Sequence, residues 1–247
     1  MKILEVGHKD FKLPTKKGYY RIFVGPNKNQ LAKIGDYRDD VGENISKMNP
    51  YYCELTAIYW AWKNLDDDVI GFAHYRRHFM SSKNQWLFLK VNEAGTLLKN
   101  NSIILPEKHL LFDLSVYEDY AYHHHIEDLS LVGESIEKLY PELLPAFKHV
   151  MNEHHYHPYN MFIMKRDELN SYCEFLFSVL GDSESKIDYL NYNTQDARVF
   201  GYISERLLDV WILGNQKQYK EIPVHMFEKN LKKILIYTKN YVKRRLK

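Results

Sequence analysis

VIGFAHYRRHF, residues 69–79, is the stretch that decides the fold. Its first six residues, Val69–His74, are mostly strand formers and predict a buried central strand. Arg76 and Arg77 follow at the carboxyl end of that strand, where unpartnered guanidinium groups would be costly to bury. A phosphate or diphosphate would supply bidentate, charge-assisted hydrogen bonds. The pattern therefore favours an anion site at these two arginines, with pairing to Asp66–Asp68 or contact with solvent as the alternative.

Outward from this strand, apolar segments of two lengths alternate along the chain. Short runs predict further strands at Lys2–Val6, Tyr20–Val24, Ser102–Leu105 and Met161–Met164. Longer runs predict helices over Pro50–Lys63, through residues 172–176 and over Arg198–Leu213. Strands separated by helices indicate an α/β fold, in which ligands collect at the carboxyl ends of the strands.

Composition narrows the class of protein. The chain has 247 residues, of which 45% are hydrophobic, 15% aromatic and 27% charged, so it can build a large core and is not disordered. Two distant cysteines give no disulfide framework and no cysteine-based zinc site. No apolar run reaches the roughly 18–20 residues of a membrane-spanning helix, and the N-terminus lacks the pattern of a signal peptide. We therefore expect a cytoplasmic protein.

The charge is unevenly distributed. Residues 229–247 carry eight basic side chains and no acid, which leaves 26 basic and 32 acidic residues of the chain in residues 1–228. Apolar residues interleave with this basic segment at nearly helical spacing, a pattern typical of helices that lie on anionic membranes. A solvated helix that packs on its own domain is the alternative. Nucleic acid is disfavoured as a partner because residues 1–228 show no basic stripe and no binding motif.

Three other polar constellations could carry chemistry. The loop Asp39–Ser46 (DDVGENIS) could bind ribose or a base, or could be an ordinary loop with Asx turns. The histidine-rich runs 123–125 and 154–157 could hold zinc, or could be loop histidines that contact substrate or water. Asp196 and Glu205 stand near arginines, where a carboxylate serves either in catalysis or in plain ion pairing.

Five ordered blocks resemble a bacterial family of capsular and exopolysaccharide glycosyltransferases, once a domain of unknown function, which includes galactofuranosyltransferases of O-antigen and capsule assembly. The blocks are GENIS with Asn49 and YYCELTAIYWAWKN (42–64), VIGFAHYRRHF (69–79), IILP (103–106), YNMFIM (159–164) and ARVFGYISERLLDVWI (197–212). The resemblance implies a GT-A-like nucleotide-sugar-binding fold with a mixed central sheet flanked by helices. It implies one such domain over residues 1–228, followed by the basic amphipathic segment 229–247.

The resemblance also implies an activity, the transfer of a sugar such as galactofuranose from a UDP-sugar to a growing glycan or lipid-linked glycan. GT-A enzymes usually hold a divalent metal with an Asp-x-Asp motif after a central strand, and here His74-Tyr75-Arg76-Arg77 stands in that place. Fixed guanidinium groups can neutralise a diphosphate, so we expect no metal cofactor, with Mn²⁺ or Mg²⁺ as the alternative. The enzyme would work peripherally at the inner face of the bacterial membrane.

Roles for individual residues follow from the resemblance. The residues expected to bind the donor are His8, Asp39, Asp40, Asn44, His74, Tyr75, Arg76, Arg77, Arg198 and Arg206. Those expected near the acceptor are His124, His125, Asn160 and Gln195. An inverting reaction needs a carboxylate base, for which the candidates are Asp128, Asp196 and Glu205, although Gln195-Asp196 leaves retention open. Two alternatives remain: a metal-dependent hydrolase built on the histidine runs, and a non-catalytic glycan-binding module.

Overall fold

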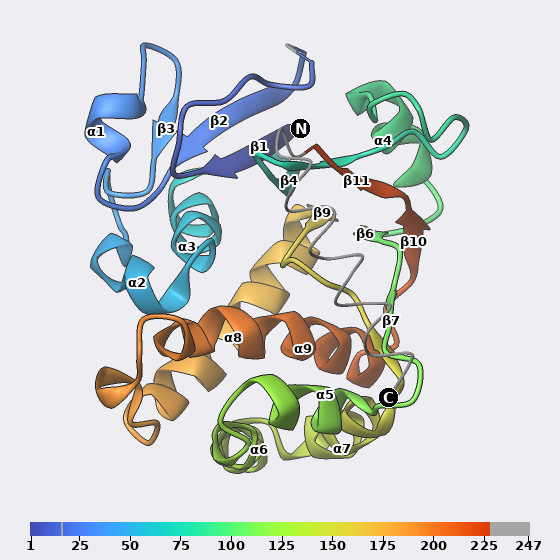
Figure 1. Cartoon of the computed structure of the whole chain (residues 1–247). Helices are drawn as coiled ribbons and strands as arrows, with labels where there is room; N and C mark the ends of the chain where they lie inside the picture. The colour runs from blue at the N-terminus through green and yellow to red at the C-terminus, as the bar shows by residue number, and fades with distance from the viewer. Residues whose placement is uncertain (16, 228–247) are drawn as a thin grey trace, which may run out of the picture.

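The computed structural model describes residues 1–15 and 17–227, and Figure 1 shows their arrangement. The predicted α/β class with a central mixed sheet flanked by helices is confirmed. The strands are β1 (Lys2–Gly7), β2 (Tyr19–Phe23), β3 (Tyr37–Arg38), β4 (Val69–His74), β5 (Arg77–Phe79), β6 (Ile103–Pro106), β7 (His109–Leu110), β8 (His155–Tyr156), β9 (Phe162–Lys165), β10 (Tyr219–Ile222) and β11 (Val224–Met226). The α-helices are α1 (Lys28–Leu31), α2 (Asn49–Tyr52), α3 (Leu55–Asn64), α4 (Val91–Leu97), α5 (Val116–His123), α6 (Glu127–Leu139), α7 (Leu144–Asn152), α8 (Arg166–Glu184) and α9 (Val199–Gly214). Short 3₁₀ helices are η1 (Ser46–Met48), η2 (Pro141–Leu143), η3 (Tyr189–Asn191) and η4 (Asp196–Arg198).

The order of the strands explains where a ligand can bind. The main sheet runs β10-β6-β9-β4-β1-β2-β3, and β9 is antiparallel to both of its neighbours, β4 and β6. The pairs β1–β2, β1–β4, β2–β3 and β10–β6 are parallel. The carboxyl ends of β1, β2, β4 and β6 therefore lie along one edge of the sheet, together with the beginning of β9.

The predicted strand Val69–His74 is β4, at the centre of the sheet between β1 and β9. Its side chains from Ile70 to Ala73 are buried. A Cβ atom placed on Gly71 would lie 2.7 Å from Cγ1 of Ile163 on β9. Glycine is therefore needed here for the close approach of the two strands.

Several helices pack together beside the sheet. In Figure 1, α8 and α9 lie between the sheet and the group formed by α5, α6 and α7. Most residues of α9 are buried, including Phe200, Leu207 and Trp211, as expected for a helix packed on several sides. No helix in residues 1–15 and 17–227 is long and apolar enough to cross a membrane.

The prediction of one helix over Pro50–Lys63 is wrong in one respect. The chain forms two helices, α2 and α3, separated at Cys53 and Glu54. Cys53 has φ 52° and ψ −127°, a backbone conformation that ends α2 and that side-chain-bearing residues rarely adopt. The predicted amphipathic segment 229–247 lies outside the described residues.

Candidate active site

A cavity of about 1130 Å³ opens at the carboxyl edge of the sheet. One wall comes from the ends of β1, β2 and β4, including Gly7, Gly25 and the segment His74–Arg77. The opposite wall comes from α5 and from the beginning of α9. Because both walls carry charged side chains, the cavity suits a large polar ligand.

Arg76 and Arg77 both line this cavity. The guanidinium carbon of Arg77 lies 4.2 Å from the ring centroid of Tyr159, and its Nε is buried without a hydrogen-bond partner among the described residues. The alternative, in which the arginines pair with Asp66–Asp68, does not hold. Those acids precede β4, so they lie at its other end, roughly 20 Å away along a six-residue strand. Asp67 pairs instead with Lys2, at 2.7 Å.

Two histidines lie beside the arginines. Nε2 of His74 is 2.7 Å from the carbonyl oxygen of Tyr159, to which it donates. Burial lowers the pKa of His74 against the opposing charge of Glu54, and the neighbouring Arg77 and Arg76 act in the same direction as burial, which favours the neutral ring. Burial also lowers the pKa of His8, whose ring packs edge-on against Tyr75 at 5.2 Å. Neutral imidazoles can hydrogen-bond a ligand without adding charge.

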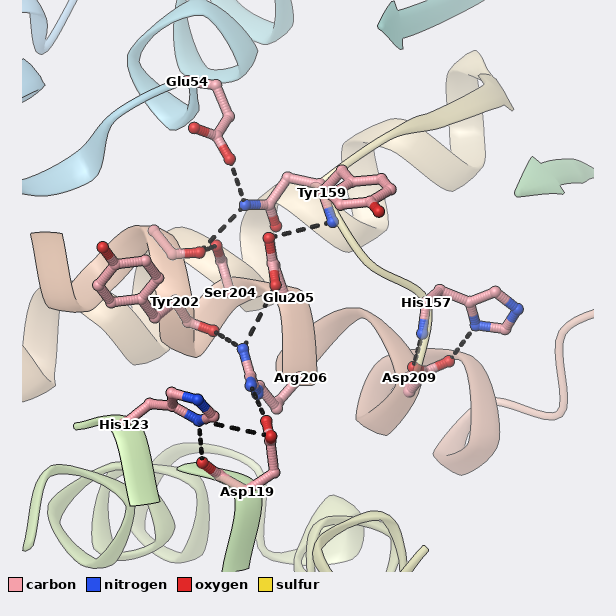
Figure 2. A network of polar contacts seen from close by, with 12 residues as sticks. Glu54, Asp119, His123, His157, Tyr159, Tyr202, Ser204, Glu205, Arg206 and Asp209 are labelled. Carbon is pink, nitrogen blue, oxygen red and sulfur yellow. Dashed lines mark hydrogen bonds and ion pairs between the residues drawn. The ribbon is translucent and has the colours of Figure 1, made fainter. Parts of the chain in front are cut away.

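Glu205 is a carboxylate of the cavity lining, as are Glu54 and Asp119. It projects from α9 into the cavity wall, where 17% of its side-chain surface is exposed. Its Oε1 accepts from the backbone N–H of Tyr159 at 3.0 Å, and its Oε2 lies 3.3 Å from Nη1 of Arg206 (Figure 2). Burial raises the pKa of Glu205 to about 7, despite the opposing charge of Arg206. A carboxyl with this pKa can exchange protons near neutral pH.

Arg206 is held too firmly to act as a free cation. It is 3% exposed and also donates from Nη2 to Asp119 at 3.2 Å and from Nη1 to the carbonyl oxygen of Tyr202 at 3.0 Å. Its guanidinium carbon lies 4.4 Å from the ring centroid of Tyr156. Figure 2 shows the resulting chain of contacts from Glu205 through Arg206 to Asp119 and His123. These contacts fix the orientation of Glu205.

A strained turn supports the same wall. Tyr159 and Asn160 have φ values of 78° and 51°, so two successive side-chain-bearing residues are left-handed. Nδ2 of Asn160 donates to Glu54 at 2.8 Å and to the carbonyl oxygen of Gly201 at 3.1 Å. Asn160 itself does not line the cavity, but Glu54 does. Such strain persists only where surrounding contacts hold it, and it gathers at functional sites.

The start of α9 contributes another arginine. Arg198 lines the cavity, and its Nε donates to Sγ of Cys53 at 3.2 Å. His124 stacks on Tyr202, with ring centroids 4.1 Å apart, and Gln195 hydrogen-bonds to the hydroxyl of Tyr202. The predicted donor residue Arg198 and the predicted acceptor residues His124 and Gln195 thus lie on one side of the cavity.

The structure places the loop Asp39–Ser46 outside this cavity. Asp39 is fully buried and accepts from Oγ1 of Thr56 at 2.6 Å, with Nζ of Lys28 3.3 Å away. Asp40 pairs with Arg38 at 3.2 Å. Asn44 donates to the carbonyl oxygen of Gly42 and accepts from the N–H of Ser46, as in an Asx turn. The loop packs against α3, where Trp60 donates to the carbonyl oxygen of Val41 and Asn64 donates to that of Glu43. Oδ1 of Asp39 and Oδ1 of Asp40 are buried without a hydrogen-bond partner among the described residues, although each lies beside a cation, Lys28 or Arg38.

Two of the three predicted catalytic acids also lie outside the cavity lining. Asp128 is 2% exposed and accepts from the hydroxyl of Tyr192 at 2.9 Å. Asp196 accepts from Asn193 at 2.5 Å and lies 3.5 Å from Nε2 of His125. The predicted acceptor residue His125 stacks on Tyr192 at 4.1 Å. These side chains form a separate cluster where η4 meets the start of α6.

The histidine runs do not converge. Among residues 1–15 and 17–227, no three His, Cys, Asp or Glu side chains are placed to hold a metal ion. His157 is buried and lies 2.5 Å from Asp209 through Nδ1 and 3.2 Å from Glu221 through Nε2. His154 hydrogen-bonds to the carbonyl oxygen of Leu114. His154 and His157 therefore serve local contacts, whereas His123 and His124 line the cavity.

Sequence reasoning missed several cavity residues. Those with polar side chains or aromatic faces are Asn27, Asn49, Cys53, Glu54, His109, Asp119, Tyr156, Tyr159 and Tyr202. One signal was available: Glu54 is the only acid between Tyr51 and Lys63, in a segment that is otherwise largely apolar. The positions of Asp119 and Tyr156 have no comparable signal, because only the packing of α5 and β8 against α9 brings them to the cavity.

Fold and site together define a GT-A-like α/β protein with a polar cavity at the carboxyl edge of its sheet. The chain belongs to the family described as Domain of unknown function (DUF4422), whose family model matches residues 2–217. It is also similar to the apo structure of WbbM, a bifunctional glycosyltransferase, with a TM-score of 0.84 and 32% identity over 92% of this chain and 45% of that chain. The comparison with curated proteins gave no match.

These comparisons confirm the predicted bacterial glycosyltransferase family and the GT-A-like fold. The chain spans less than half the length of the bifunctional neighbour. The similarity supports glycosyl transfer in general, whereas donor, acceptor and stereochemistry belong to the proposal below.

Proposed function

We propose that this protein is a glycosyltransferase that moves a sugar from a UDP-sugar to a growing capsular, exopolysaccharide or O-antigen glycan. Galactofuranose is the sugar that the family resemblance suggests. The observation that carries the proposal is the joint presence, in one cavity, of the paired arginines Arg76 and Arg77 and of Glu205 with a pKa of about 7.

The arginines suit a departing diphosphate. When the bond between sugar and phosphate breaks, negative charge grows on the diphosphate oxygens, and fixed cations stabilise that charge without reorganising. Arg77 has a buried Nε without a protein partner among the described residues and a guanidinium plane supported by Tyr159. Arg198, across the cavity, can add a third guanidinium group. In this proposal these groups supply the charge that a divalent metal supplies in other GT-A enzymes.

Glu205 suits the role of general base in an inverting transfer. The acceptor hydroxyl must lose its proton as it attacks the anomeric carbon through an oxocarbenium-like transition state. A base with a pKa near 7 is ionised in a useful fraction at neutral pH and still binds a proton well. Of Asp128, Asp196 and Glu205, only Glu205 lines the cavity, so we assign the role to it.

The region around Tyr202 suits the acceptor. His124, Gln195 and Tyr202 present aromatic faces and hydrogen-bonding groups beside Glu205. Sugars bind through such mixtures of ring stacking and polar contact. An acceptor held here would present its hydroxyl to the carboxylate, with the donor diphosphate on the sheet side of the cavity.

The test replaces Arg77 by alanine and measures UDP affinity by titration calorimetry, with excess EDTA throughout. Losing a charge-assisted hydrogen bond of roughly 1.5–3 kcal/mol should weaken UDP binding by about 10- to 100-fold. The matched control is Arg38→Ala, which removes an arginine that pairs with Asp40 and does not line the cavity. Unchanged UDP affinity in Arg77→Ala, or binding to the wild type that requires Mn²⁺ or Mg²⁺, would refute the proposed role of the arginines.

A further inference from the structure

A group of exposed apolar side chains lies beside the cavity rather than in it. Trp86, Leu87, Met226 and Phe227 are 78%, 54%, 44% and 49% exposed. They come from the loop before α4 and from the end of β11, which lie on the same side of the sheet in Figure 1. Two of the four, Trp86 and Phe227, are aromatic, and we call the four residues together the aromatic patch.

Ring contacts join the two segments into one surface. Trp86 lies 6.0 Å from His225, and Phe88 lies 5.4 Å from Phe227, both measured between ring centroids. An exposed apolar cluster of this kind usually marks a surface that another body covers. The position of the patch along the chain indicates which body that is.

The basic segment of the chain follows the patch in the sequence, with residue 229 two positions after Phe227. Residues 229–247 carry eight basic side chains and no acid. Lys83 and Lys90, on either side of Trp86 in the sequence, are also exposed. Aromatic side chains surrounded by positive charge are typical of surfaces that enter the headgroup region of anionic bilayers.

The patch is also linked to the donor arginines. The backbone N–H of Phe227 donates to the carbonyl oxygen of Arg76 at 2.8 Å, and Met226 pairs with Arg77 across β11 and β5. A partner bound to the patch would therefore lie next to the backbone that carries Arg76 and Arg77 in the cavity wall.

We propose that the aromatic patch inserts into the headgroup region of an anionic lipid bilayer and holds the cavity at the membrane surface. This inference rests on the proposed function, because a bilayer beside the cavity matters for an acceptor carried on a lipid. It extends that function by assigning membrane contact to the folded domain as well as to the basic segment. The basic segment provides electrostatic attraction, and the patch provides apolar burial and a fixed orientation.

The experiment uses the full chain and vesicles of phosphatidylglycerol and phosphatidylethanolamine, with phosphatidylcholine vesicles for comparison. Sedimentation with the vesicles measures the bound fraction for the wild type, for Trp86→Ala/Leu87→Ser and for Leu190→Ser. Leu190 is 69% exposed and far from the patch in sequence, so it controls for the loss of an exposed leucine. Removing the two apolar side chains should weaken binding to the anionic vesicles on the order of tenfold or more.

Each outcome decides the proposal. It is supported if the double variant binds anionic vesicles more weakly and Leu190→Ser binds them as the wild type does. It is overturned if the wild type ignores anionic vesicles, if the double variant binds like the wild type, or if the wild type is a dimer that the double variant breaks, since a second copy then covers the patch. UDP affinity, measured on the same variants, should stay unchanged. If the wild type bound vesicles but did not bind UDP, the proposed function would be wrong, whereas the assignment of the aromatic patch to membrane binding would still hold.

Discussion

Replacement of Glu205 by glutamine should remove the base while preserving the wall around it. The amide oxygen of glutamine can still accept from the backbone N–H of Tyr159, the contact that now measures 3.0 Å. Loss of a general base commonly costs about 10²- to 10⁴-fold in rate, so kcat should fall by that factor. The amide NH2 group would face Nη1 of Arg206, which keeps Asp119 and the carbonyl oxygen of Tyr202 as acceptors. The pKa of about 7 also sets the pH profile of the wild type. The ionised fraction in the free enzyme is roughly one tenth at pH 6 and one half at pH 7, so kcat/KM for the donor should rise about fivefold between them and less than about twofold above.

The assay is single-turnover transfer from the UDP-sugar to a soluble acceptor, followed from pH 5.5 to 8.5. Asp196→Asn is the matched control, because it removes an equal charge from a carboxylate that pairs with Asn193 outside the cavity lining. It should retain most of the activity and the pH profile of the wild type. If Glu205→Gln kept more than about a third of the wild-type kcat, or if Asp196→Asn lost as much as Glu205→Gln, the assignment of the base would be wrong.

Two further predictions concern stability. Glu5 is fully buried in β1, 3.0 Å from Nδ1 of His78, and burial raises its pKa from 4.5 to about 7. The folded state therefore binds a proton that the unfolded chain releases, so the stabilisation from this proton is complete below about pH 4.5 and is lost as pH rises through 7. Chemical denaturation should show about 3 kcal/mol of pH dependence in the free energy of unfolding, and this dependence should disappear in Glu5→Gln. An equal pH dependence in both proteins would contradict the prediction. Asp128→Ala should cost about 1–2 kcal/mol, because Tyr192 loses its acceptor and the first turn of α6 loses an acid, while kcat stays near that of the wild type; a large loss of kcat would reopen Asp128 as the base.

The sequence could predict the sheet side of the cavity because that side depends on local pattern. The run Val69–His74 is apolar enough to identify a central strand, and Arg76 and Arg77 follow it directly. Once the strand is buried between β1 and β9, residues at its carboxyl end must face the edge where parallel α/β sheets bind ligands. The prediction needed no knowledge of distant contacts.

The helical side could not be predicted in the same way. Asp39 and Asn44 look like ligand-binding residues because they are polar and near a glycine. In the structure, however, Asp39 accepts a hydrogen bond from Thr56, which is distant in the sequence, and Asn44 accepts one from the backbone N–H of the nearby Ser46. Conversely, Asp119 lies on a helix with no distinctive pattern. It belongs to the cavity wall because the fold brings it within 3.2 Å of Arg206, which is 87 residues away in the sequence. Pattern reveals which residues are polar, whereas packing decides which of them are left for a ligand.

The two halves of the cavity should also influence each other. The positive charge of Arg77 lowers the pKa of Glu205, although burial outweighs it. A bound diphosphate would offset part of that charge, so the pKa of Glu205 should rise when the donor binds. The pH profile of kcat/KM for the donor reports the free enzyme and that of kcat reports the complex, so the acid limb of kcat should lie at the higher pH. Equal limbs would mean that Arg77 and Glu205 do not share the reacting centre, because two charges that act on the same sugar must sense the same diphosphate.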